Sequence, residues 1–189
     1  MLLQCPKIKD DKLYYGGSQD WFHDKWAQMA GCASVCATNV YVYYLNQQKV
    51  YTKEQYLHFQ EKLYALLTPG KRGYPYVYHY ARKVGNLLQR DYQIIRNPGI
   101  EKGYHFIKEA IDHGNPVSML VLTHHSIRMR DDKWHWMTIF GYDQDSIYYS
   151  SYGKMKKIKT RVLLKKHRIN VVKLVRFVNK NQEASLFVK

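Results

Sequence analysis

Long hydrophobic runs are absent from this sequence of 189 residues, and none approaches the roughly 20 apolar residues that span a membrane. The first residues also lack a basic stretch followed by an apolar one, so we expect no secretory signal. Apolar side chains are nevertheless plentiful: the hydrophobic content is 46%, which argues against intrinsic disorder. The length suits one core, so we expect residues 1–189 to form a single domain.

Cysteine is scarce, with only Cys5, Cys32 and Cys36 in the chain. Three cysteines do not make the even disulfide framework of a small secreted protein. Cys32 and Cys36 are also one helical turn apart on the same face, which is a poor geometry for a disulfide. We therefore expect free thiols and a reducing, cytoplasmic location.

Acidic residues are missing between Ser146 and Gln182, in a chain whose net charge is +15. We call the range Lys154–Lys180 the basic segment; its cationic residues are Lys154, Lys156, Lys157, Lys159, Arg161, Lys165, Lys166, Arg168, Lys173, Arg176 and Lys180. Such a segment raises the local concentration of an anionic partner, for example nucleic acid or a membrane face. The alternative interpretation is the ordinary solvated surface of a lysine-rich protein.

The sequence indicates no metal site and no cofactor. His124 and His125 are adjacent, and neighbouring side chains on a strand point to opposite faces, so the two are not expected to join His135 around a metal. Gly16 and Gly17 lack the following glycine spacing and the lysine of a phosphate-binding loop.

The first half of the chain has helical patterns. Residues 32–45 follow Gly31 and are apolar nearly all round, which predicts a central, buried helix. A capping box at residues 52–55 opens a second helix to about residue 67. Further helices are predicted over residues 75–89 and 99–112.

The second half changes to β-branched and aromatic runs between turn signals. These runs predict strands over residues 116–122, 134–142, 147–151 and 170–178, with a hairpin turn at residues 143–145. Helices first and strands last predict an α+β domain, with an N-terminal helical half packed on a C-terminal antiparallel sheet.

Cys32 and His135 stand out chemically, because each begins an apolar element and the two are about a hundred residues apart. A helix N-terminus favours the thiolate, so we expect a lowered pKa for Cys32. An imidazole at a strand end can share the proton and later deliver it to a leaving group. The alternative is a buried, inert cysteine and an unrelated histidine. Cys36 is expected to fill the core.

Three motifs follow one another along the chain: Gly31-Cys32-Ala33-Ser34, then the run His135–Tyr142, then the run Tyr149–Lys154. In this order they resemble papain-like cysteine peptidases, and most closely the bacterial branch related to the double-glycine leader peptidases of bacteriocin exporters. The segment Tyr15–Phe22 is similar to small Firmicutes proteins of that branch. The resemblance covers about residues 13–160 and implies a papain-like α+β fold.

The resemblance also implies roles for individual residues. Cys32 matches the nucleophile and His135 the general base. A glutamine upstream of the cysteine usually donates a side-chain N–H to the oxyanion hole. Gln19 matches by motif, although its distance of 13 residues from Cys32 exceeds the usual gap, and Gln28 is the alternative.

The third catalytic position departs from the family, which has Asn or Asp there. Aligned on Gly153, Ser150 takes the orienting place, whereas counting from His135 favours Ser151; Asp143 is a nearby carboxylate and a further alternative. A serine hydroxyl can accept a hydrogen bond from the imidazole but carries no charge to stabilise an imidazolium. The departure therefore predicts slow turnover or an inactive copy.

The function expected from these residues is hydrolysis of a peptide or amide bond by thiol acyl transfer. Deamidases, transglutaminase-like enzymes and acyltransferases use the same pair, because one fold hosts several chemistries. The alternative is a catalytically inactive binding module whose basic segment meets an anionic partner. The sequence indicates neither the substrate nor the oligomeric state.

Overall fold

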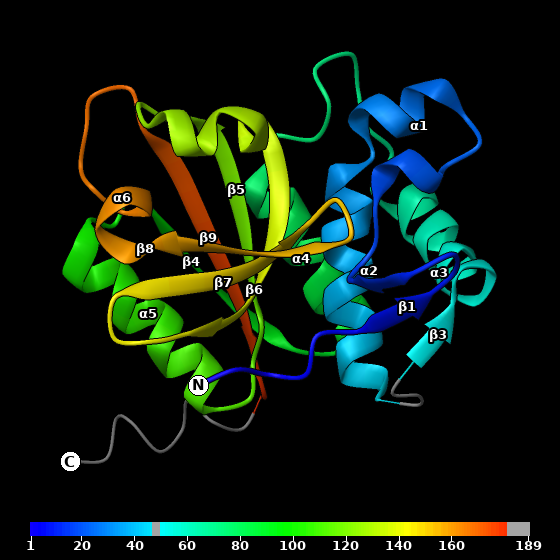
Figure 1. Cartoon of the computed structure of the whole chain (residues 1–189), viewed down its shortest axis with the longest axis horizontal. Helices are drawn as coiled ribbons and strands as arrows, with labels where there is room; N and C mark the ends of the chain where they lie inside the picture. Colours follow the sequence, from blue (N-terminus) through cyan, green and yellow to red (C-terminus); the bar gives the residue numbers. More distant parts are fainter. Residues whose placement is uncertain (47–49, 181–189) are drawn as a thin grey trace.

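A six-stranded sheet forms the centre of the computed structural model, which describes residues 1–46 and 50–180 (Figure 1). Its strands are β4 (Asp91–Arg96), β5 (Val117–Thr123), β6 (His135–Tyr142), β7 (Ser146–Ser151), β8 (Lys154–Lys159) and β9 (Val171–Val178). They lie in the order β4-β9-β5-β6-β7-β8, and each is antiparallel to its neighbours.

Helices cover both faces of this sheet. On one side lie α2 (Cys32–Leu45), α3 (Lys53–Leu66) and α4 (Val77–Leu88), and on the other lie α5 (Ile100–Asp112) and the short α6 (Thr160–Leu163). Shorter turns of helix are α1 (Lys25–Ala30), η1 (Gln19–Trp21) and η2 (Ile127–Asp132).

A second, small sheet packs on the helical half. It consists of β1 (Lys7–Lys9), β2 (Leu13–Tyr15) and β3 (Val50–Thr52), in the order β2-β1-β3. Ile8 and Tyr51 from this sheet are buried with Val42 of α2 and Tyr56 of α3. The sheet thereby anchors the N-terminal segment on α2.

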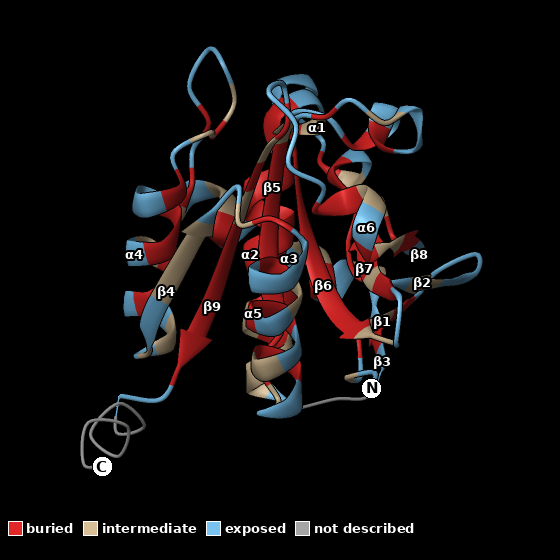
Figure 2. Ribbon diagram, turned by 90° about the vertical axis from the view of Figure 1, so that its left-hand side faces the viewer, coloured by how far each residue is buried: buried red, intermediate tan, exposed pale blue. Residues whose placement is uncertain are grey.

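Alternation along the central strands builds two cores, one on each face of the sheet. On β6, Trp136 packs in the cluster beneath α2 and α4, whereas Met137 and Ile139 pack beneath α5. Figure 2 shows β5, β6 and β9 buried along nearly their whole length. Helix α2 is apolar nearly all round because it lies between this sheet and α3.

The predicted helices are confirmed, and α2 has the predicted bounds. Thr52 and Gln55 form the predicted capping box at the start of α3. The α+β fold class is likewise confirmed, with helices first and antiparallel strands last. In the part of the chain that the structure describes, no helix has the length and apolar character needed to cross a membrane.

Sequence patterns missed β4, β8 and the small sheet. β4 and β8 are the two edge strands of the large sheet, and their side chains are largely polar or lysine. Edge strands commonly carry charged residues, which prevent pairing with another chain but hide the apolar alternation used to recognise a strand. β1, β2 and β3 are only three residues long, too short for a pattern.

Candidate active site

Cys32 is the first residue of α2 and is 7% exposed. Gly31 ends α1 and begins α2, so the chain turns sharply just before the thiol. A side chain at Gly31 would place its Cβ 2.5 Å from the carbonyl oxygen of Ala27 and 2.6 Å from the ring of Phe22. Glycine is therefore required at this position by close packing.

His135 is the first residue of β6 and is buried against Tyr152. The two rings are parallel within 3°, with centroids 4.5 Å apart. Tyr152 lies in the turn between β7 and β8 with a φ of 50°, a left-handed conformation that is uncommon for a tyrosine. This stacking fixes the plane of the imidazole and shields one of its faces from water.

Two indirect connections link Cys32 and His135. A backbone hydrogen bond from Trp136, the residue after His135, favours the thiolate of Cys32. Tyr152, which stacks on His135, lies near enough for the charge of a Cys32 thiolate to raise the pKa of its hydroxyl. Among the described residues, the thiol and the imidazole are not hydrogen-bonded to each other, as is common before a substrate binds.

Burial controls the protonation of both groups. It raises the pKa of the Cys32 thiol to about 11, against the backbone hydrogen bonds and the helix N-terminus that favour the thiolate. It also lowers the pKa of His135 to about 4; the charge of Asp132 opposes this shift, and Lys156 adds to it. The sequence predicts a lowered pKa for Cys32, but burial outweighs the helix N-terminus and raises it, so desolvation favours the neutral form of both groups.

The serines proposed for the third position point to different partners. The hydroxyl of Ser150 donates a hydrogen bond to the carbonyl oxygen of Tyr15 at 2.7 Å, and so holds the N-terminal segment. The hydroxyl of Ser151 donates to the Asp132 carboxylate at 2.7 Å. Of the two, Ser151 is therefore the one connected to the surroundings of His135.

Asp132 is a buried carboxylate that sequence reasoning missed. It is 2% exposed and accepts hydrogen bonds from Tyr149, Ser151 and Lys156 at 2.9, 2.7 and 2.8 Å. Burial raises the pKa of the Asp132 carboxyl, but the three hydrogen bonds lower it by a larger amount. The pKa therefore lies below its usual range. The acid pair at residues 131–132, three positions before His135, was the available sequence signal.

Asp143 lies elsewhere. It follows the last residue of β6, while His135 is the first, and an eight-residue strand spans roughly 25 Å. Its carboxylate accepts hydrogen bonds from Tyr148 and Lys157, both at 2.7 Å. Asp143 therefore closes the β6–β7 hairpin and does not contact the imidazole.

The two candidate glutamines bond to backbone close to Cys32 in sequence. Gln19 is buried on η1, and its side-chain N–H donates to the carbonyl oxygen of Gln28 at 2.6 Å. The Gln28 amide donates to the carbonyl oxygen of Phe22, also at 2.6 Å. Each amide keeps a second N–H, so hydrogen bonding does not choose between them. They differ in burial, because Gln19 is buried and Gln28 is half-buried.

A groove of about 210 Å³ opens beside the thiol. Its lining is mainly apolar and aromatic: Trp26, Met29, Ala30, Cys32, Lys71, Arg72, Gly73, Tyr74, Pro75, Leu120, Leu122, Trp134 and Trp136. Two indole N–H groups fix one wall, because Trp134 donates to Arg72 and Trp136 donates to Tyr74, in both cases to the carbonyl oxygen. The groove therefore presents an apolar and aromatic surface beside the thiol.

The other cysteines are away from this groove lining, and all three cysteines are free thiols. Cys36 is buried one turn along α2, where its thiol donates to the carbonyl oxygen of Met137 at 3.0 Å. Burial raises the pKa of the Cys5 thiol well above its usual value.

His124 and His125 correct an expectation about neighbouring side chains. They follow the end of β5 instead of lying within it, so strand alternation does not apply, and their rings stack with centroids 5.0 Å apart. The ring of His125 also stacks on His167 at 4.6 Å. Among the described residues, no group of three or more His, Cys, Asp or Glu side chains is arranged to hold a metal ion.

Comparison with known proteins finds no matching family model and no matching curated protein. Solved structures do match, among them a protein from Bacillus anthracis described as a C39-like peptidase. The superposition covers 87% of this chain and 94% of that one, with a TM-score of 0.50 and 12% identity. The chain has a papain-like peptidase fold. In this papain-like arrangement, α2 is the central helix that begins at Cys32, and β6 begins at His135.

Proposed function

We propose that this chain is a cysteine peptidase or amidohydrolase that transfers an acyl group from a peptide or amide to Cys32. One observation carries the proposal. Cys32 is the first residue of α2 and His135 the first residue of β6, and both lie near Tyr152. The papain-like fold supports the same chemistry, although one fold hosts several reactions.

The first half of the reaction begins from the neutral pair. His135 takes the proton of the Cys32 thiol while the sulfur attacks the substrate carbonyl carbon and the carbonyl electrons move onto oxygen. The imidazolium then gives this proton to the leaving amine as the C–N bond breaks, leaving a thioester on Cys32. In the second half, His135 takes a proton from water while the water oxygen attacks the thioester carbon. The C–S bond then breaks, the acid leaves, and the imidazolium returns its proton to the sulfur of Cys32.

The developing oxyanion needs N–H donors. The backbone N–H of Cys32 is available because it lies in the first turn of α2, where no residue four positions earlier within the helix accepts it. The second side-chain N–H of Gln19 is the further donor we propose.

Asp132 supplies the charge that a serine at the third position lacks. When His135 becomes an imidazolium, the buried carboxylate of Asp132 stabilises it, and Ser151 holds the carboxylate in place. Lys156 bonds to the same carboxylate and weakens this stabilisation, which favours slow turnover. We therefore assign Asp132 and Ser151 as positioning residues, in place of Ser150 or Asp143.

The substrate we propose is a peptide bound in the groove beside Cys32, with an apolar side chain against Trp134 and Tyr74. The resemblance of the sequence motifs favours the branch related to double-glycine leader peptidases. Free thiols throughout the chain favour a reducing cytoplasm.

The test is to trap the acyl intermediate. The purified protein is mixed with activated peptide esters of varied side chains and analysed by mass spectrometry for a thioester, which neutral hydroxylamine removes. We expect an adduct on Cys32 that His135→Ala greatly reduces. Cys36→Ser is the matched control, because it changes a thiol one turn further along the same helix and keeps a hydrogen-bond donor.

An adduct on Cys32 that is unaffected by His135→Ala would contradict the proposed pair. The absence of any adduct across the ester series, with the protein folded, would contradict the enzyme and leave the inactive binding module.

A further inference from the structure

Two cations stand side by side on the sheet next to the groove that holds Cys32. Arg96, the last residue of β4, is the register partner of Lys173 on β9, so the two side chains lie on the same face of the sheet. We call these two residues the cation pair. Lys173 is in turn the register partner of Leu120 on β5, and Leu120 lines the groove. The two cations therefore lie one and two strand spacings from Leu120, roughly 5 and 10 Å.

Further contacts connect the cation pair to the groove wall. The ammonium group of Lys173 donates a hydrogen bond to the carbonyl oxygen of Pro75 at 3.5 Å, and Pro75 also lines the groove. The guanidinium of Arg96 lies over the ring of Tyr78, 5.9 Å from its centroid. Both cations are thus held directly behind the wall.

The two positive charges repel each other. Like charges directly opposite each other on neighbouring strands destabilise a sheet. Burial lowers the pKa of Lys173, and the charge of Arg96 lowers it further. In the described part of the chain, neither side chain forms an ion pair with a carboxylate. An anion shared by both cations would relieve the repulsion, and the ammonium group keeps two further N–H donors for it.

The chain around the groove wall adds positive charge. No acidic residue occurs between positions 62 and 90, a range that contains the exposed residues Lys71, Arg72 and Arg82. Lys71 and Arg72 line the groove. Burial raises the pKa of the Tyr74 hydroxyl, and the nearby charge of Arg82 opposes this shift. This side of the groove therefore attracts negative charge.

Exposed aromatic rings extend the groove toward the cation pair. Tyr76 and Tyr78 are 58% and 54% exposed. The ring of Tyr76 lies 6.1 Å from that of Tyr74, which lines the groove, and Tyr78 lies beneath the guanidinium of Arg96. Tyrosine offers both an apolar face and a polar hydroxyl, so these rings suit contact with a peptide.

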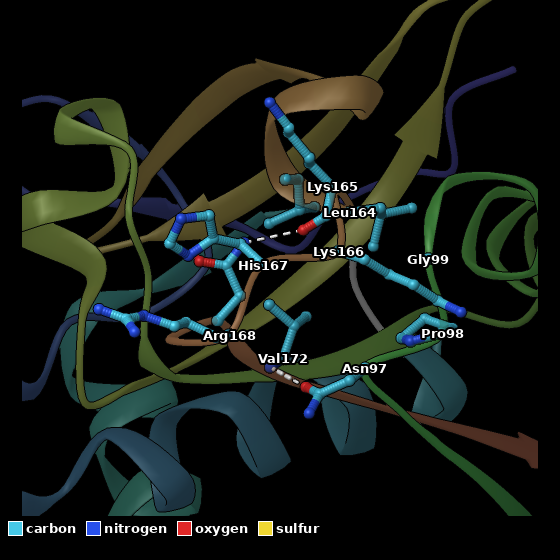
Figure 3. Close-up of a pocket in the computed structure, with 11 residues that line it drawn as sticks. Asn97, Pro98, Gly99, Leu164, Lys165, Lys166, His167, Arg168 and Val172 are labelled. Carbon is cyan, nitrogen blue, oxygen red and sulfur yellow. Dashed lines mark hydrogen bonds between the residues drawn. The ribbon is translucent and has the colours of Figure 1, made fainter.

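Other cations also lack an ion pair among the described residues, but they lie on the other face of the sheet. Figure 3 shows Lys166 in a cavity on the α5 side, where it runs toward Pro98 and Gly99. Arg161 belongs to α6, on that same side. Neither residue lines the groove beside Cys32, so both serve as comparisons for the cation pair.

We propose that the cation pair makes the protein selective for acidic peptides, by binding a carboxylate close to the apolar side chain held in the groove. The inference rests on the proposed function, because it concerns the peptide bound beside Cys32. The carboxylate lies between Lys173 and Arg96. An extended chain advances about 3.3 Å per residue, so a distance of roughly 5–10 Å from Leu120 corresponds to about two or three residues.

The test compares peptide esters that carry one phenylalanine and, two or three residues to either side of it, an aspartate, asparagine or lysine. Formation of the Cys32 thioester is followed at constant ionic strength over a range of peptide concentrations. For the best position, we expect the KM of the aspartate peptide to be about fivefold below that of the asparagine peptide, with kcat within twofold. The lysine peptide should have the highest KM.

Variants of the cation pair should remove this preference without general loss of binding. Lys173→Met keeps most of the side-chain volume and should abolish the difference between aspartate and asparagine, while the KM of the asparagine peptide changes less than twofold. Arg96→Gln should reduce the difference in the same way. Lys166→Met and Arg161→Gln are the matched controls: they remove the same charges on the α5 side and should keep the preference. Circular dichroism establishes that each variant is folded.

Thioester formation on Cys32 without any preference for aspartate would overturn the inference and leave the proposed function intact. Equal loss of the preference in Lys173→Met and Lys166→Met would also overturn it, because the attraction would then be general. If no ester acylates Cys32, the proposed function fails. Calorimetric binding of the same peptides then decides the selectivity, and equal affinities for aspartate and asparagine would refute it. Tighter binding of a single-stranded oligothymidylate than of the aspartate peptide, lost in Arg96→Gln, would assign the cation pair to nucleic acid instead.

Discussion

The ionised fraction of the Cys32 thiol gives the sharpest prediction, because a neutral resting pair and a thiolate–imidazolium pair differ in this fraction by orders of magnitude. With a pKa of about 11, roughly 10⁻³ of the thiol is ionised at pH 8, against about a quarter for an unperturbed cysteine. A thiolate–imidazolium pair would instead be ionised at pH 6. We therefore expect alkylation of Cys32 about two orders of magnitude slower than that of a free thiol at pH 8.

The assay is iodoacetamide labelling of the native protein between pH 5 and pH 10, with each cysteine followed by mass spectrometry. Restricted access slows labelling equally at every pH, so the slope, not the rate, reports the pKa. We expect the rate at Cys32 to rise about tenfold per pH unit through the whole range. Rapid labelling at pH 6 that His135→Ala abolishes would refute the neutral resting pair and the dominance of burial.

Three further predictions concern neighbouring residues. The folded pKa of His135, about 4, lies below its ordinary value of 6.5, so the unfolded chain takes up the proton first and stability falls as pH drops from 6.5 to 4. In His135→Gln, the fall in the free energy of unfolding between pH 7 and pH 4 should be smaller by up to about 3 kcal/mol, as measured by urea unfolding at both pH values. If the fall is the same in the variant and the wild type, burial does not lower the pKa of His135. Asp132→Asn should lower kcat by about one to two orders of magnitude, because a buried charge near the imidazolium is lost. It should also lower the free energy of unfolding by about 1–3 kcal/mol, a modest cost because Lys156 is partly exposed. Asp131→Asn, at an exposed carboxylate, is the control, and equal kcat values for the two variants would refute the role of Asp132. Gly31→Ala should lower stability by about 1–3 kcal/mol through contact with Ala27 and Phe22, and an unchanged Tm would show that the turn can relax.

The helices could be predicted because their signals are local. The apolar run of α2, the capping box of α3 and the glycine after α5 each lie within a few neighbouring residues. The edge strands could not, because β4 is a strand only through its pairing with β9, and β8 only through β7. Their own side chains face solvent as much as core, so periodicity carries little information there.

The candidate site divides in the same way. Cys32 and His135 could be named from the sequence, since each follows a break and opens an apolar element. Asp132 could not, because its importance comes from Tyr149, Ser151 and Lys156, which reach it from β7 and β8. A serine in the usual acid position indicated a missing charge, and we propose that Asp132, which precedes His135 in the sequence, supplies it.

The sequence by itself determined which groups are chemically capable: a thiol at a helix start, an imidazole at a strand start and an excess of lysine. Only the tertiary structure decided the protonation of the first two, because desolvation depends on how many atoms surround a group and not on its neighbours along the chain. It also decided which lysines are paired with carboxylates and which surround a cavity, because those carboxylates come from distant parts of the chain.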